Sequence, residues 1–338
     1  MTTAIEPDDA RASERLAWAR AATGSPALAL SSASADAGFR SYWRASVPGG
    51  DSVVLMDSPP ALEDVRPWLR VHALLDAGGV RVPRILARDV DAGLLLLEDL
   101  GSRTCLQVID DANAQALFDA AVTQLLQLQA IDCPDWMPDY DDALLVREMR
   151  LFDDWFLQRH LGINLEGAER EALERAFGFL SATALSQPRV LVHRDFMPRN
   201  LMPVDDGVAV LDFQDAVRGP IAYDVLSLYK DAFTSWPEAR FEEWVARYHA
   251  RAADAGLPVG GLDAFRRDVD LIGVQRHLKV LGIFARLLHR DAKPKYLSDA
   301  PRFLDYLDTV LPRHPELHAL HALLQQRIRP AFAAGAVK

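Results

Sequence analysis

One polar segment, set between two short apolar runs, constrains the fold more than any other part of the chain. It reads Val192-His193-Arg194-Asp195-Phe196-Met197-Pro198-Arg199-Asn200, and Leu211-Asp212-Phe213-Gln214 follows it. The apolar runs at 190–192 and 208–211 predict two short strands, each with a polar loop beside it. We therefore expect Asp195, Asn200 and Asp212 to lie on loops at the ends of successive strands.

These three side chains suit one kind of chemistry, the transfer of a phosphoryl group. That reaction needs a carboxylate that orients the accepting hydroxyl and takes its proton, and divalent cations that neutralise the phosphate oxygens. Asp195 can be the catalytic base, while Asn200 and Asp212 offer the hard oxygen ligands that Mg²⁺ prefers. The alternative is that Asp195 and Asn200 only form turns between strands, as both residue types commonly do.

The charge of the chain limits its partners. The net charge of −11 over 338 residues argues against a general binder of nucleic acid or of anionic membranes, although a local basic patch for a phosphorylated ligand stays possible. The two cysteines, Cys105 and Cys133, have no metal-ligand spacing and fit a reducing compartment.

Targeting signals are also absent from the sequence pattern. The first ten residues are acidic and lack the basic-then-apolar layout of a secretory signal. No apolar run approaches the roughly 18 residues that span a bilayer. We expect a cytoplasmic protein with a small-molecule substrate; the oligomeric state stays open.

The predicted secondary structure changes from mostly β to mostly helical near residue 100. Residues 6–22 predict a first helix, and β-prone runs follow at 27–30, 39–47 and 52–56. A helical stretch at 62–76 precedes two more expected strands, 85–89 and 94–98. Beyond Gly101 helical spacing dominates, as in 112–130, 144–160 and 166–185. This order predicts an α+β, two-lobed protein with a small β-rich lobe at 1–100 and a larger, mostly helical lobe at 101–338.

The polar segment resembles the catalytic and metal-binding loops of the protein-kinase-like superfamily, and the chain is similar to its aminoglycoside phosphotransferase family. In particular it resembles the bacterial cell-wall amino-sugar kinases, which phosphorylate N-acetylmuramate and N-acetylglucosamine at the anomeric hydroxyl. The likeness runs from about 27 to 302. Besides the catalytic loop, it is carried by Val53-Val54-Leu55-Met56-Asp57-Ser58-Pro59-Pro60, by 211–217 with Gly219-Pro220, and by 275–286.

The resemblance implies a two-lobed kinase fold, ATP as phosphoryl donor and Mg²⁺ as cofactor. It places Asp195 on the catalytic Asp, and Asn200 and Asp212 on the metal ligands. His193 falls on a position that usually supports the loop. Asp224, in a Tyr-Asp pair that opens a helix, is expected to be a cap or a loop anchor.

One departure from the superfamily concerns the cation that binds the ATP phosphates. Many members carry a lysine on a strand of the small lobe, paired with a helix glutamate. No lysine precedes Lys230 in this chain. Arg40 and Arg44 are the available replacements, and Glu63 could pair with either; each arginine could equally be a solvated residue on a strand face.

The second departure is the turn at 30–39, where protein kinases have a glycine-rich phosphate loop. This turn is rich in Ser and Ala, and Ser32 and Ser34 could add hydroxyl donors to the backbone amides. The resemblance also places the backbone at Glu98 and Leu100, where the lobes join, beside the adenine; Glu98 could instead cap the following segment.

The acceptor pocket is expected in the helical lobe. Arg276, His277 and Lys279 form a cationic stretch that could hold a carboxylate-bearing sugar, and Arg276 and Lys279 share a helix face. An internally paired face of a buried helix is the alternative. Asp215, just past the metal loop, is a further acceptor candidate, while Trp43, Trp155, Trp236 and Tyr229 are more typical of a core than of sugar stacking.

Three other functions stay open at this stage. An aminoglycoside kinase would suit the negative net charge but not the cationic stretch at 276–279. A choline-type kinase would need an aromatic cage with carboxylates. A non-catalytic nucleotide-binding scaffold would explain the missing lysine, but not the presence of all three of Asp195, Asn200 and Asp212.

Overall fold

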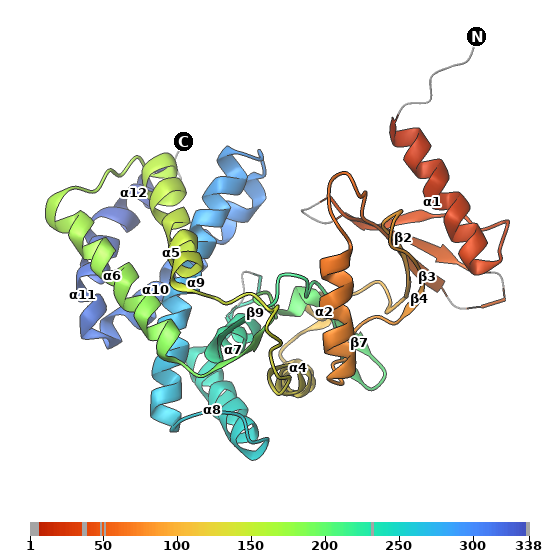
Figure 1. Ribbon diagram of the computed structural model, residues 1–338. Helices are drawn as coiled ribbons and strands as arrows, with labels where there is room; N and C mark the ends of the chain where they lie inside the picture. Colours follow the sequence, from red (N-terminus) through yellow and green to blue (C-terminus); the bar gives the residue numbers. More distant parts are fainter. Residues whose placement is uncertain (1–6, 36–38, 48, 51, 231–232, 336–338) are drawn as a thin grey trace, which may run out of the picture. The chain divides into compact units, whose positions relative to one another are not determined.

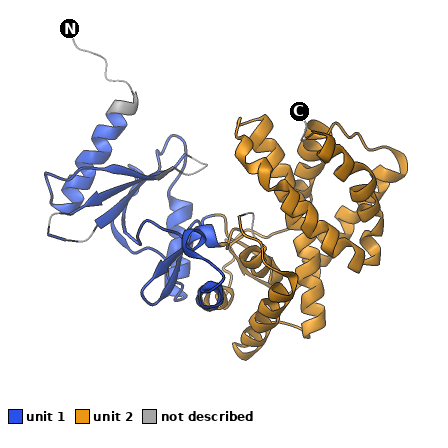
Figure 2. Ribbon diagram, turned by 180° about the vertical axis from the view of Figure 1, so that it is seen from behind, with its two compact units in different colours: residues 1–124, 198–214 blue, residues 125–197, 215–338 orange. Residues whose placement is uncertain are grey.

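The computed structural model describes residues 7–35, 39–47, 49–50, 52–230 and 233–335. The chain divides into two compact units, coloured separately in Figure 2: Met1–Gln124 with Pro198–Gln214, and Leu125–Met197 with Asp215–Lys338. The chain leaves the second unit after Met197 and returns to it at Asp215, so the catalytic segment is shared between the units along the sequence. The lobe boundary near residue 100 stays a prediction.

The first unit is built on a five-stranded antiparallel sheet with the order β1-β2-β3-β5-β4. Helix α1 and the strands are labelled in Figure 1 where there is room. The bounds are α1 (Pro7–Thr23), β1 (Ser31–Ala35), β2 (Ser41–Ser46), β3 (Ser52–Asp57), α2 (Arg66–Ala77), β4 (Ile85–Asp89), β5 (Leu94–Glu98), α3 (Cys105–Val108) and α4 (Ala114–Gln129), the last of which continues into the second unit.

Side-chain alternation explains how this sheet is covered. Leu55 pairs with Leu96, and both pack with Leu94 and with Ala19 of α1 in one buried cluster. Their neighbours Leu95 and Leu97 point to the other face and are buried as well, so β5 is apolar on both faces up to Glu98. The expected strand at 27–30 is wrong. Leu28 is a buried core residue before the sheet, and the polar Ser31–Ala35 segment forms β1 because it pairs with β2.

The first unit also contains the hairpin that follows the catalytic segment. Its parts are η2 (Pro198–Asn200), β7 (Leu201–Val204) and β8 (Gly207–Val210). The Val210 amide donates to the Arg81 carbonyl (2.7 Å), and Phe213 lies against Trp68 of α2 with ring centroids 5.0 Å apart. These contacts fix the two ends of the hairpin, which carry Asn200 and Asp212.

Among the described residues of the second unit, the strands are the antiparallel pair β6 (Arg189–Val192) and β9 (Val217–Pro220), and the other regular elements are helical. Its longest helix, α9, runs through a cluster of buried apolar side chains. The helical elements are α5 (Asp142–Leu151), the π-helical η1 (Phe152–His160), α6 (Gly167–Ser186), α7 (Ala222–Tyr229), α8 (Glu238–Asp254), α9 (Leu262–His289), η3 (Pro294–Asp299), α10 (Ala300–Val310), η4 (Leu311–Arg313), η5 (Pro315–Leu317), α11 (His318–Leu323), η6 (Leu324–Ile328) and α12 (Arg329–Gly335).

The close approach of α9 to α5 depends on a glycine. A Cβ added at Gly282 would lie 2.2 Å from the carbonyl carbon of Leu151, so only glycine fits there. The β-rich first unit and the helical second unit confirm the predicted α+β class. Within the described ranges, no helix has the length and apolar character needed to cross a membrane.

Candidate active site

Asp195 lies in the loop between β6 and η2, and its side chain is 41% exposed. A ligand can therefore reach its carboxylate. The residue before it, Arg194, has a φ of 75°, in the left-handed region that non-glycine residues rarely adopt. Asp212 has the same kind of backbone, with a φ of 63°. Such conformations concentrate at functional sites, where surrounding contacts hold them in place.

Asp224, in the first turn of α7, anchors the loop that carries Asp195. Its carboxylate accepts hydrogen bonds from the amides of His193 (2.6 Å) and Arg194 (3.0 Å), and it is fully buried at the start of α7. Burial raises the pKa of Asp224 to about 6, while His193 and the two amides act against the rise. This placement matches the expected loop anchor.

His193 is buried beside the base rather than presented to a substrate. Its Nδ1 lies 3.2 Å from the Asp195 amide, which donates to it, and its ring meets Phe196 edge-on. Because that nitrogen accepts, the proton of a neutral His193 ring is on Nε2. The geometry agrees with a residue that supports the loop.

The charges around Asp195 favour its ionised form. The partial burial of this carboxyl group alone would raise its pKa, but Arg276, whose Nη2 lies 3.4 Å from Asp195 Oδ1, and then Lys279 outweigh it and lower the pKa. A base must be deprotonated before it can accept a proton, so this environment prepares Asp195 for that role.

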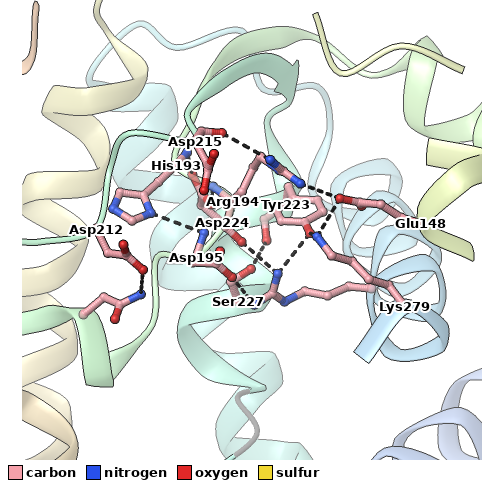
Figure 3. A network of polar contacts seen from close by, with 12 residues as sticks. Glu148, His193, Arg194, Asp195, Asp212, Asp215, Tyr223, Asp224, Ser227 and Lys279 are labelled. Carbon is pink, nitrogen blue, oxygen red and sulfur yellow. Dashed lines mark hydrogen bonds and ion pairs between the residues drawn. The ribbon is translucent and has the colours of Figure 1, made fainter. Parts of the chain in front are cut away.

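Behind the loop lies a buried network of polar side chains, drawn in Figure 3. Glu148 of α5 receives Lys279 Nζ at 2.8 Å, Arg194 Nη2 at 2.5 Å and the hydroxyl of Tyr140. Lys279 also donates to the Tyr223 hydroxyl at 3.2 Å. Burial works against ionisation of Glu148, yet Lys279 and Arg194 hold the pKa of Glu148 below its usual value.

From the sequence, Glu148 could reach the cleft from the start of its helix, but it was not chosen as a site residue. A glutamate with buried Leu145 and Met149 as helix neighbours is a usable signal, because an acid in the buried phase of a helix requires a partner. Tyr140 and the Tyr223 hydroxyl had no such signal.

The candidate metal ligands lie together in the first unit. Asn200 Nδ2 is 3.5 Å from Asp212 Oδ2, and Gln214 Nε2 donates to Asp212 Oδ1 at 2.8 Å. Turning the Asn200 amide by 180° brings its oxygen beside the carboxylate, and this pair of hard donors fits Mg²⁺. Over the described part of the chain, no group of three or more His, Cys, Asp or Glu side chains is placed to hold a metal ion.

The two candidate arginines for the nucleotide differ in their partners. The Arg44 guanidinium is paired within the protein: its Nε and Nη2 donate to the Asp99 carboxylate at 2.6 and 3.0 Å, and Nη2 also donates to the Gly101 carbonyl. Arg40 is buried just before β2, with its Nε 3.2 Å from the Glu63 carboxylate. The pairing expected between an arginine and Glu63 is thus made by Arg40.

The other candidate nucleotide contacts lie on β1, at the end of β5 and just beyond it. Ser32 is exposed on β1, whereas Ser34 pairs in register with Tyr42 and its side chain lies outside the described residues, as do 36–38. Glu98 ends β5, and Arg81 and Arg84 hydrogen-bond its carboxylate, lowering its pKa to about 2 against the effect of burial. Leu100 is half-buried in the segment that follows.

The structure separates the expected acceptor residues. Arg276 and Lys279 lie together on α9 and both donate to the Tyr223 hydroxyl. His277 does not join them, because the next helix position is turned by about 100°. Its buried ring stacks on Tyr306 with centroids 5.0 Å apart, and burial lowers its pKa well below the usual value.

Asp215 is exposed just past the metal loop, and its carbonyl accepts a long hydrogen bond of 3.4 Å from Arg194. The Asp215 side chain is therefore accessible to a substrate that accepts the phosphoryl group, whereas the buried His277 ring is not.

Comparisons with known proteins agree with these features. The model of the family described as "Phosphotransferase enzyme family" matches residues 29–265. The chain is 52% identical to the N-acetylmuramate/N-acetylglucosamine kinase of Pseudomonas aeruginosa, over 88% of either chain. It is 44% identical to the protein of the same name from Neisseria meningitidis, over 88% of this chain and 90% of that one.

Solved structures show the fold. Choline kinase LicA from Streptococcus pneumoniae has a TM-score of 0.62 at 13% identity, covering 88% of this chain and 99% of its own. ADP-bound aminoglycoside phosphotransferase APH(2'')-Ib has a TM-score of 0.54 at 14% identity, covering 82% and 92%. The predicted kinase-like fold is confirmed. With the family model matching most of the chain, the protein belongs to the phosphotransferase enzyme family.

Proposed function

We propose that this protein is a kinase that transfers the γ-phosphoryl group of ATP to the anomeric hydroxyl of N-acetylmuramate and N-acetylglucosamine. The names of the relatives at 44–52% identity support the substrate class. The observation that carries the proposal is Asp195, an accessible carboxylate held ionised beside Arg276 in a loop that leads directly to Asn200. A scaffold freed from catalysis would have no need of this arrangement.

Asp195 acts as the general base in this proposal. The acceptor hydroxyl donates its proton to a carboxylate oxygen of Asp195 while its oxygen forms a bond to the γ-phosphorus. The bond between that phosphorus and the β,γ-bridging oxygen breaks, and ADP leaves. A hemiacetal hydroxyl is more acidic than an ordinary alcohol, so a carboxylate whose pKa is lowered is still a sufficient base.

Asn200 and Asp212 would hold Mg²⁺, which supplies charge neutralisation at the phosphate oxygens. Arg40, fixed by Glu63, is our candidate for the cation that contacts the ATP phosphates, since Arg44 is engaged by Asp99 and Gly101. Ser32, Ser34 and the backbone near Glu98 and Leu100 complete the proposed nucleotide contacts. Asp215 remains the proposed acceptor contact, whereas Lys279 is occupied by Glu148 and the Tyr223 hydroxyl.

The product, an amino sugar 1-phosphate, belongs to the salvage of peptidoglycan sugars. Such a role places the enzyme in the cytoplasm, where ATP is available.

An acceptor screen coupled to ADP release tests the proposal. With ATP and Mg²⁺, N-acetylmuramate and N-acetylglucosamine should be turned over, and Asp195→Ala should lower the rate by about 10²–10⁴-fold. Asp206→Ala, in the exposed turn of the β7–β8 hairpin, is a matched control that should keep the wild-type rate. Turnover of kanamycin-like amines without turnover of amino sugars would assign the protein to another acceptor class.

A further inference from the structure

The residue before the base, Arg194, is held in its unusual backbone conformation from three helices (Figure 3). Its amide donates to Asp224 of α7 at 3.0 Å. Its carbonyl accepts from Arg276 Nη1 of α9 at 2.8 Å. Its guanidinium contacts Glu148 of α5. Since the left-handed backbone is unfavourable for a non-glycine residue, contacts of this kind are needed to keep Arg194 in it.

Arg276 is the member of this set that also touches the base. Its Nη1 binds the Arg194 carbonyl and, at 3.0 Å, the Tyr223 hydroxyl, while its Nη2 faces Asp195 Oδ1 at 3.4 Å. One planar guanidinium thus spans the peptide before the base and the carboxylate itself. The side chain is only 7% exposed, so it presents little surface to an acceptor.

We infer that Arg276 is a positioning residue for the transfer step, which aims the Asp195 carboxylate through the Arg194 carbonyl and its own ion pair with Asp195. This inference rests on the proposed kinase function and assigns Arg276 a different role from the acceptor contact expected from the sequence. A single ammonium could not replace it fully, because the fixed fork of the guanidinium reaches three acceptors at once.

The surrounding charges support this role rather than a free cationic pocket. Lys279, one turn along the same face of α9, is neutralised by Glu148 and also binds Tyr223. Glu148 in turn binds Arg194. Arg276 and Lys279 of α9 are therefore part of the contacts that support the catalytic loop.

The test separates kcat from KM in Arg276→Met and Arg276→Lys. In the methionine variant we expect kcat to fall by about tenfold or more, because a misaligned base loses part of its contribution. KM for the amino sugar and the dissociation constant of ADP should change less than about twofold, and the lysine variant should recover part of the rate. Arg286→Met, ten residues further along α9 and outside the network, is the matched control that should keep kcat.

A second arm places Arg276→Met in an Asp195→Asn background. If Arg276 acts through Asp195, the methionine change should cost less than about twofold there, as expected for residues that act as a unit. An equal loss in both backgrounds would show a general structural role and overturn the inference. A rise in KM for the sugar with kcat unchanged would make Arg276 an acceptor contact instead, and would leave the kinase function intact.

Should Arg276→Met fail to fold, Tyr223→Phe decides the question. It removes one hydroxyl that Arg276 and Lys279 share, and keeps the ring. A fall in kcat at constant KM supports the inference, and wild-type kcat contradicts it. An absence of turnover by the wild-type enzyme itself is a different result, since it refutes the proposed function.

Discussion

Removing the negative charge of Glu148 should destabilise the second unit far more than an ordinary ion-pair deletion. Glu148→Gln keeps the size of the side chain but leaves two cations, Lys279 and Arg194, without their shared carboxylate. The side chains of Glu148 and Lys279 are 7% and 9% exposed, so water cannot replace the lost partner.

The size of the effect follows from this burial. Breaking a buried pair by removing one partner costs about 3–5 kcal/mol, because an uncompensated charge stays inside the protein. Domains are typically stable by about 5–15 kcal/mol, so the loss is a large share of the free energy of unfolding. The double variant Glu148→Gln/Lys279→Met should be more stable than the single variant, since it removes one of the two unpaired cations.

Urea unfolding followed by circular dichroism measures these free energies. Glu174→Gln is the matched control. Glu174 of α6 pairs with Arg150, which lies on α5 as Glu148 does, and the side chains of this pair are more exposed, at 41% and 34%. That control should lose no more than about 1 kcal/mol. Equal small losses of unfolding free energy in Glu148→Gln and Glu174→Gln would show that the buried network does not stabilise the catalytic loop.

Two further predictions concern a buried acid and a helix crossing. Burial raises the pKa of Asp224 to about 6, so the folded state binds this proton more tightly than the unfolded chain and loses stability as pH rises from about 4 to about 6. In urea unfolding measured across this pH range, Asp224→Asn should remove the part of the pH dependence of the free energy of unfolding that Asp224 causes. Burial also raises the pKa of Asp268 to about 6, so Asp268→Asn should remove a separate part. An unchanged pH dependence in both variants would contradict the raised pKa values. Gly282→Ala should lower the free energy of unfolding by about 1–3 kcal/mol through overpacking against α5. Gly178→Ala, at an open position of α6, should leave this free energy unchanged or raise it by up to about 1 kcal/mol. If Gly178→Ala were the more destabilising change, the close crossing of α9 and α5 at Gly282 would be contradicted.

The local sequence pattern predicted much of this fold because local and tertiary preferences agree there. The apolar run of β5 is short and lies between turn residues, as expected for a buried strand, and it is buried on both faces. The first strand was misplaced because Ser31–Ala35 has little strand character of its own and is recruited by pairing with β2. The same reasoning could not assign the β7–β8 hairpin to the first compact unit, since contacts such as Val210 with Arg81 join residues far apart in the sequence.

The candidate site was predicted where chemistry and spacing lie in one segment. Asp195, Asn200 and Asp212 belong to a short stretch, and the structure gives each a setting suited to its expected role. The acceptor side was harder. Helical spacing put Arg276 and Lys279 on one face, but only tertiary structure shows that Glu148 and Tyr223 occupy their donors.

The most direct test of the central claim is the position of the new phosphate. After incubation with ATP, Mg²⁺ and N-acetylglucosamine labelled with ¹³C at the anomeric carbon, NMR should show coupling between phosphorus and that carbon. The Asp195→Ala protein should form this product at least about 100-fold more slowly. Phosphate bound to another carbon of the sugar, or an unphosphorylated sugar with only inorganic phosphate released, would contradict the account.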